Sequence, residues 1–94
     1  MSDIGAILRL EPIPASWNGH DFQIARPTLA DLVEAVDHAQ KNPSSGRAWA
    51  LHRHLRYTDG MPVFATVELA AHAPAGLAAK FVPMIEALYN EGVD

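Results

Sequence analysis

The chain has 94 residues, of which 49% are hydrophobic, and its 11 acidic and 7 basic side chains leave a net charge of −4. A chain of this length is near the lower limit for independent folding, so we expect a single domain over residues 1–94 with a thin core. The negative charge disfavours binding to nucleic-acid phosphates. The sequence contains no cysteine, which excludes disulfides, thiolate metal sites and a cysteine nucleophile.

The N-terminal sequence MSDIGAILRLEP has no basic region and only a short apolar run, so we do not expect a signal peptide. No apolar run in the chain approaches the ~20 residues that cross a bilayer. We therefore expect a protein of the cytoplasm with no membrane partner. Because a thin core with spare apolar surface favours association, we also expect a homo-oligomer or a complex with another protein.

The dipeptide Asn18-Gly19 predicts a tight hairpin near the N-terminus. Both residue types tolerate the positive φ that a type I′ turn requires. Folding the chain back about this turn gives three opposed pairs: Trp17 with His20, Ala15 with Phe22, and Ile13 with Ile24. We expect an antiparallel hairpin over residues 7–25, including a short strand at residues 7–10, after a loose leader over residues 1–6. An isolated hairpin is marginal in water, so a helix must cover its apolar face.

A first helix is expected from Thr28 to about Lys41. Pro27 forces the residue before it into extended backbone, and Thr28 is a typical N-cap residue. Asp31 lies three residues after Thr28, where its carboxylate can bond back to the N-cap residue and complement the helix dipole. The apolar side chains of this helix form one continuous stripe: Leu29, Leu32, Val33, Val36 and Ala39. The polar side chains fall on other faces, where we expect solvent: Asp31, Glu34, Asp37 and His38.

Residues 42–46, Asn-Pro-Ser-Ser-Gly, form the clearest break in the chain. Ser44 or Ser45 is positioned to cap a second helix over about residues 47–57. A turn is expected at residues 58–62, where the sequence reads Thr-Asp-Gly-Met-Pro.

Thr66 is expected to cap a short third helix, and Pro74 to start a last helix that ends at Gly92. Pro83 lies inside this last helix, where a proline kinks or interrupts the backbone ladder. The predicted fold class is therefore mainly α within α+β. An N-terminal hairpin is followed by about four short helices over residues 28–92.

No motif typical of an enzyme or a metal site occurs in the sequence. His52 and His54 form an H-x-H pair, but two residues so spaced on a helix project in different directions and cannot ligate one ion. No serine lies in a nucleophile-elbow pattern, the carboxylates are scattered singly, and glycine-rich phosphate loops are missing. We therefore expect no catalytic activity, no metal and no cofactor.

The predicted second helix is unusually basic, with Arg47, Arg53 and Arg56. Three interpretations remain open. These side chains are solvated or pair with the acidic first helix; they dock an acidic protein surface; or the two helices form a helix-turn-helix that reads DNA. Three arginines on an acidic domain make few phosphate contacts, so DNA is the weakest of the three.

The order of motifs over roughly residues 20–92 resembles the small tail assembly chaperones of long-tailed bacteriophages and prophages. The resemblance rests on the helix "RPTLADLVEA", the turn "DGMPVF", the short helix beginning "TVELAA" and the closing helix "FVPMIEALYNEG". It implies a mostly helical, non-catalytic protein of the bacterial host cytoplasm. Such chaperones bind the long tape measure protein and recruit tail tube subunits, and they are absent from the finished virion.

The residue types that dominate interface hot spots supply the candidate partner contacts. These are Trp49, Arg53, Arg56, Phe81 and Tyr89. Phe81 lies on the apolar stripe of the last helix, so core packing is its main alternative. Trp49 and Tyr89 flank the stripes and are equally consistent with core and interface, whereas arginines such as Arg53 and Arg56 are most often simply solvated.

Two other classes of protein fit the same sequence. One is a small regulatory module that binds DNA or a toxin, for which a salt-sensitive shift of duplex DNA would be the sign. The other is a structural tail or head-completion subunit, which would be found in purified virions.

Overall fold

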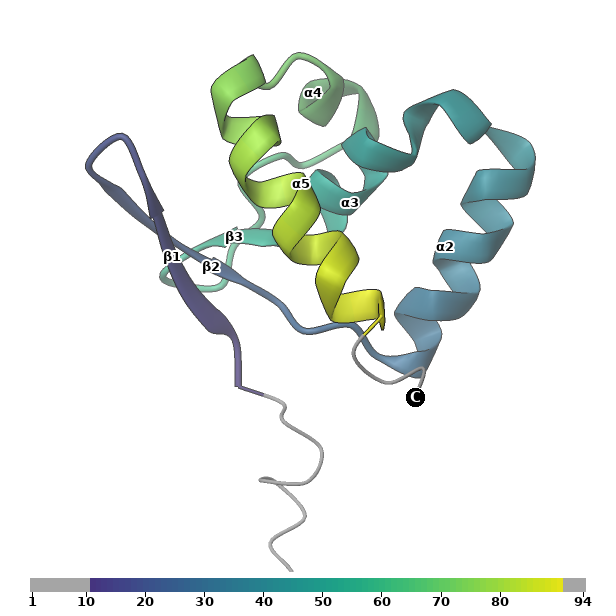
Figure 1. Cartoon of the computed structure of the whole chain (residues 1–94), viewed down its shortest axis with the longest axis horizontal. Helices are drawn as coiled ribbons and strands as arrows, with labels where there is room; N and C mark the ends of the chain where they lie inside the picture. The colour runs from purple at the N-terminus through teal and green to yellow at the C-terminus, as the bar shows by residue number, and fades with distance from the viewer. Residues whose placement is uncertain (1–10, 91–94) are drawn as a thin grey trace, which may run out of the picture.

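The computed structural model describes residues 11–90, which form a small α+β domain (Figure 1). The elements in chain order are β1 (Ile13–Trp17), β2 (His20–Ile24), α2 (Leu29–Lys41), the 3₁₀ turn η1 (Pro43–Ser45), α3 (Gly46–His54), β3 (Leu55–Tyr57), α4 (Val67–Ala71) and α5 (Ala75–Asn90). The expected fold class, a hairpin followed by four α-helices in this part of the chain, is confirmed. The leader expected over residues 1–6 and the strand expected over residues 7–10 lie outside the described residues.

The predicted hairpin is confirmed in turn and register. Asn18 and Gly19 both have positive φ, 52° and 81°, as the two-residue turn requires. The pairs across the hairpin are those expected from the turn: Trp17 with His20, Ala15 with Phe22, and Ile13 with Ile24. The hairpin therefore fixes which side chains of β1 and β2 share a face of the sheet.

A third strand, β3, pairs with β2 in antiparallel register and corrects one prediction. Residues 55–57 were expected to end the second helix, but α3 stops at His54 and Leu55 adopts extended backbone. The Ala25 N–H donates to the His54 carbonyl at 2.9 Å, which continues the sheet pairing and draws the chain away from the helix.

Ser45 occupies the N-cap position of α3, but its side chain makes no capping bond there. Its hydroxyl donates to the Asn42 carbonyl instead.

Both outer strands of the sheet have their edges partly closed. In β1, Pro14 has no N–H, and the Ser16 carbonyl accepts from the Lys80 ammonium group on α5. Beside β3, Pro62 forms an isolated bridge to Arg56. These contacts leave fewer free backbone groups on the sheet edges.

The apolar face of the hairpin is covered by α5, as a marginal hairpin requires. Phe81 of α5 packs edge-on against Phe22 with ring centroids 5.9 Å apart, and the Trp17 ring approaches Gly76. The largest fully buried apolar side chains come from four elements: Phe81, Ile24, Leu51, Leu55 and Ile85. Pro83 is exposed and α5 continues past it to Asn90, so this proline does not break the helix.

The start of α2 follows the prediction closely. Thr28 is the N-cap, and its hydroxyl accepts from the Asp31 N–H at 3.3 Å. The Asp31 carboxylate accepts from the Thr28 N–H at 2.9 Å, which completes a reciprocal capping box. The helix therefore begins and ends where the sequence indicates.

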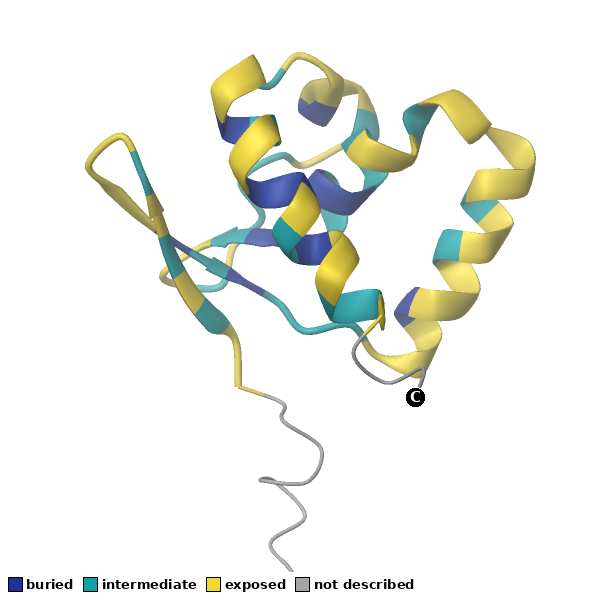
Figure 2. Ribbon diagram, in the orientation of Figure 1, coloured by how far each residue is buried: buried dark blue, intermediate teal, exposed yellow. Residues whose placement is uncertain are grey.

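The orientation of α2 is the opposite of what an amphipathic helix on a core shows. Asp31, expected in solvent, is only 6% exposed, whereas Leu29, Leu32, Val33 and Val36 are 76%, 46%, 61% and 53% exposed. Figure 2 shows α2 as the most exposed helix of the fold, with one buried segment near its start. The physical reason is the ion pair between Asp31 and Arg53 of α3, which turns the carboxylate inward and the apolar stripe outward.

Candidate protein-binding site

A pocket of about 620 Å³ lies between α2, the η1–α3 segment and α5. Ala35 and His38 line it from α2, Trp49 from α3, and Val82, Glu86 and Tyr89 from α5. In Figure 1, α2 is joined to the rest of the fold at its two ends and stands apart from α5 between them. The pocket is thus the space that α2 leaves by packing on α3 rather than on α5.

Trp49 provides the aromatic surface of this pocket. Its ring stacks on His38 with centroids 6.0 Å apart and an interplanar angle of 29°. Tyr89 lies on another side of the indole, with centroids 6.5 Å apart. Three elements thus contribute rings to one cluster, and such amphipathic rings offer large contact areas at little cost in side-chain entropy.

Tyr89 is held by a hydrogen-bonded chain that ends in the backbone. The His54 Nδ1 lies 2.8 Å from the Ala25 carbonyl, and its Nε2 lies 2.5 Å from the Tyr89 hydroxyl. A carbonyl only accepts, so Nδ1 carries the proton and Nε2 accepts from the Tyr89 O–H. Burial lowers the pKa of His54 and raises that of Tyr89, so both stay neutral in this chain.

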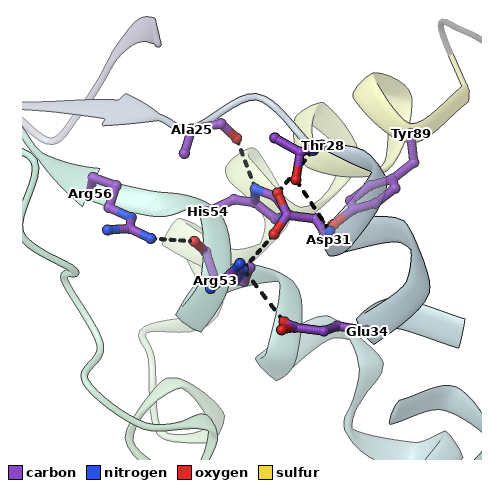
Figure 3. A network of polar contacts seen from close by, with 8 residues as sticks. All are labelled: Ala25, Thr28, Asp31, Glu34, Arg53, His54, Arg56 and Tyr89. Carbon is purple, nitrogen blue, oxygen red and sulfur yellow. Dashed lines mark hydrogen bonds and ion pairs between the residues drawn. The ribbon is translucent and has the colours of Figure 1, made fainter. Parts of the chain in front are cut away.

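Besides the His54–Tyr89 chain, an ion pair between Asp31 and Arg53 fixes α2 to α3 (Figure 3). The Arg53 Nε donates to Asp31 Oδ1 at 2.6 Å and lies 3.7 Å from a Glu34 carboxylate oxygen. Burial alone would raise the pKa of Asp31, but the hydrogen bonds from Thr28 and Arg53 outweigh it and leave that pKa below its usual range. The Asp31–Arg53 pair is therefore charged at neutral pH, and it holds the N-terminal half of α2 in place.

The apolar stripe of α2 adjoins the pocket. Ala35 lines the pocket, and Leu32 and Ala39 lie one turn to either side of it along the helix. Val36 follows Leu32 by one turn and leads outward to the rest of the exposed stripe. The stripe therefore begins next to the pocket on α2, but none of its residues lines the pocket.

The structure brings two of the five predicted contact residues together. Trp49 and Tyr89 both line the pocket. Arg53 lies beside them but is engaged by Asp31, and Arg56 donates to the carbonyls of Arg53 and Gly60. Phe81 is fully buried in the core, so it cannot contact a partner of the folded protein.

Sequence reasoning missed the parts of the site that depend on long-range pairing. It did not place Asp31 inward, because the partner charge on Arg53 is 22 residues away. It considered His54 only as half of an H-x-H pair on a helix, because nothing local indicates the Ala25 carbonyl or the Tyr89 hydroxyl. The exposed stripe was visible in the sequence, but its outward direction was not.

Two further observations on the described residues bear on the chemistry of the site. Within residues 11–90, no three histidine or carboxylate side chains gather where they could hold a metal ion. Over the same residues no helix combines the length and apolar character needed to cross a membrane. Of the polar side chains that line the pocket, Tyr89 is bonded to His54, and Arg47 and Glu86 have no hydrogen-bond or ion-pair partner among the described residues.

Comparison with known proteins finds no counterpart for this arrangement. A scan against protein-family models, a search of curated proteins and a search of solved structures each return no match to the chain.

Proposed function

We propose that this protein is a non-catalytic tail assembly chaperone of a long-tailed bacteriophage or prophage. It acts in the bacterial cytoplasm, where it binds the tape measure protein and recruits tail tube subunits. The single observation that carries the binding role is the exposed apolar stripe of α2 beside the pocket. The identity of the partners comes from the resemblance over residues 20–92.

The outward apolar stripe supports this role because apolar side chains exposed to water raise the free energy of an isolated molecule. Four aliphatic side chains on successive turns of one helix leave apolar area in water that a partner would cover, at roughly 25 cal/mol per Å². Anchors at i, i+3, i+4 and i+7 are the pattern by which helices bind grooves or other helices. A chaperone that holds a long helical protein before assembly would use such a surface.

The charge arrangement favours this proposal over DNA binding. Residues 11–90 contain six lysine and arginine side chains: Arg26, Lys41, Arg47, Arg53, Arg56 and Lys80. Five of them contact an oxygen atom of the chain itself. Arg47 is the only one of the six that makes no such contact within this range. One unbonded cation among residues 11–90, on a chain whose net charge is −4, gives little attraction to phosphates.

Co-purification tests the proposal directly. The tagged chain is expressed with the tape measure and tail tube proteins of the same genome, and any complex is weighed by light scattering. We expect a complex that keeps the tape measure protein soluble. We expect the double variant Leu32→Ser/Val36→Ser to lose it. The matched control is Leu69→Ser, since Leu69 is 54% exposed on α4, away from the pocket.

An insoluble tape measure protein with nothing co-eluting would contradict the proposal. Finding the chain in purified virions would also contradict it, because that location belongs to a structural subunit.

A further inference from the structure

We propose that the pocket between α2, α3 and α5 binds a small zwitterion with an aromatic body, the chemistry of a free aromatic amino acid or of a dipeptide that contains one. The aromatic body lies against Trp49, the carboxylate of the ligand faces Arg47, and its ammonium group faces Glu86. This inference does not rest on the proposed function, because the α2 stripe that carries the partner-binding role does not line the pocket.

The pocket has the size and the floor of a small-ligand site. Its volume of about 620 Å³ is within the range that small ligands occupy in proteins. Ala50 of α3 and Val82 and Ile85 of α5 line it and are buried, so they form an apolar floor. The apolar body of a ligand would therefore be covered by carbon atoms instead of water.

Aromatic rings from three elements determine where a planar group would lie. His38 stacks on the half-buried Trp49 with centroids 6.0 Å apart, and the Tyr89 ring is tilted to the indole at 6.5 Å. Hydrogen bonds hold both neighbours of the indole. The His38 Nε2 lies 2.7 Å from the Ser45 hydroxyl oxygen, and the Tyr89 hydroxyl donates to His54. The rings are thus fixed before a ligand arrives, which lowers the entropy cost of packing an aromatic group against Trp49.

Two charged side chains of opposite sign line the same pocket. Arg47 comes from the first turn of α3 and Glu86 from α5, and both are exposed at its mouth. Neither side chain forms a hydrogen bond or an ion pair with a described residue, the other one included. A ligand with a single charge would meet one opposite and one like charge, and the two contributions would largely cancel. A ligand with both charges can place each against its opposite, so the pair favours a zwitterion over an anion or a cation.

Three probes with the same phenyl ring test the charge pattern. Phenylalanine is a zwitterion, 2-phenylethylamine carries only the ammonium group, and 3-phenylpropionate carries only the carboxylate. The protein carries Trp17→Phe, so that Trp49 is its only tryptophan and its emission reports on the pocket. We expect phenylalanine to change that emission and to bind at least about 10-fold more tightly than either other probe. Calorimetric titration of the unsubstituted chain gives the same comparison without the Trp17 change.

Replacing either charge should change the preference among the probes in a different direction. Glu86→Gln should weaken phenylalanine by at least about 10-fold and leave 3-phenylpropionate bound at least as tightly as phenylalanine. Arg47→Gln should weaken phenylalanine to a similar extent and leave 2-phenylethylamine bound at least as tightly. The matched control is Glu68→Gln, since Glu68 is exposed on α4 and does not line the pocket, and its affinity for all three probes should be unchanged.

Glycyl-phenylalanine separates the two sources of the ligand. Tighter binding of this dipeptide than of phenylalanine would assign the pocket to a short peptide, and the reverse would assign it to a free amino acid. No binding of either zwitterion at millimolar concentration, equal affinity for the three phenyl probes, or an unchanged preference in Glu86→Gln would each overturn the inference. These results leave the proposed function standing, because co-purification tests the α2 stripe. A failed co-purification in turn leaves the pocket assignment standing.

Discussion

His54 joins three parts of the fold through one side chain. Its ring bonds the Ala25 carbonyl after β2 and the Tyr89 hydroxyl on α5, and it packs edge-on against Trp49. It is fully buried, so the neutral form is held in an environment that penalises a proton. The pocket wall at Tyr89 therefore depends on a titratable residue.

We expect the free energy of unfolding to fall as the pH drops below about 6.5. Burial lowers the pKa of His54, so below that pH the unfolded chain binds a proton that the folded chain excludes. The contribution is fully present above about pH 6.5 and is lost toward acid by at most about 1.4 kcal/mol per pH unit. Urea unfolding between about pH 7.5 and 5 measures it.

The control for this pH dependence is a histidine that faces solvent. His20→Gln, at the exposed hairpin turn, should keep the wild-type slope, whereas His54→Gln should lower stability throughout and flatten the slope. Parallel slopes in all three proteins would show that His54 does not carry the effect.

Asp31 and Asp37 are a matched pair for testing the attachment of α2. Both are on α2 beside a cation, but Asp31 is buried against Arg53 and Asp37 is exposed beside Lys41. Asn at position 31 keeps an oxygen for the Thr28 N–H, but it loses the charge and the second oxygen that accepts from Arg53. We expect Asp31→Asn to cost about 1–2 kcal/mol and Asp37→Asn less than about 0.5. Equal costs, measured by denaturant unfolding, would mean that the inward turn of α2 does not depend on this ion pair.

At the scale of elements, the ends of α2 could be predicted from the sequence, but the face of α2 that packs on the fold could not. Local chemistry determines the ends of the helix, because Thr28 and Asp31 satisfy each other within one turn. Local chemistry does not determine which face packs. A stripe of four aliphatic residues would ordinarily be assigned to the core, but the contacts of Asp31 with Arg53 and of His38 with Trp49 and Ser45 turn the other face of α2 inward.

β3 and α5 show the same division. The strand β3 exists because residues 55–57 find β2, a pairing across more than thirty residues that the helical spacing of Leu51 and Leu55 conceals. In α5, Phe81 was predicted as a partner contact with core packing as its alternative, and the structure places it in the core. Whether Pro83 kinks or breaks the helix was left open, and α5 continues through it. For the candidate site, Trp49 and Tyr89 were identified by residue type, but their meeting in one pocket required the fold.

Replacing the α2 stripe should leave the fold intact. Because Leu32 and Val36 are exposed, we expect Leu32→Ser/Val36→Ser to change the free energy of unfolding by less than about 1 kcal/mol. Phe81→Ala, in the core, should cost about 3–5 kcal/mol by the same denaturant assay. A large loss from the double variant would mean that the stripe is covered within the folded chain.

At the scale of the whole molecule, most of the described cations are engaged within the fold. Arg53, which suggested a basic docking strip, pairs with Asp31, and Arg56 donates to the backbone carbonyls of Arg53 and Gly60. We therefore expect no shift of duplex DNA at micromolar protein, even at about 50 mM salt, where phosphate contacts are strongest. A gel-shift titration measures this, and a salt-sensitive complex would favour the regulatory module instead.

The closed edges of the sheet bear on how this molecule behaves at high concentration. An apolar helix face in water invites association, and in many proteins an open strand edge would let such contacts grow into cross-β stacks. Here Pro14 has no N–H to offer, the Ser16 carbonyl is bonded by Lys80, and Pro62 flanks the opposite strand. Fewer backbone groups are thereby left free to pair with the strand of a second molecule. We therefore expect contacts made through the exposed face of α2 to stay contacts between helices and not to extend into a growing sheet.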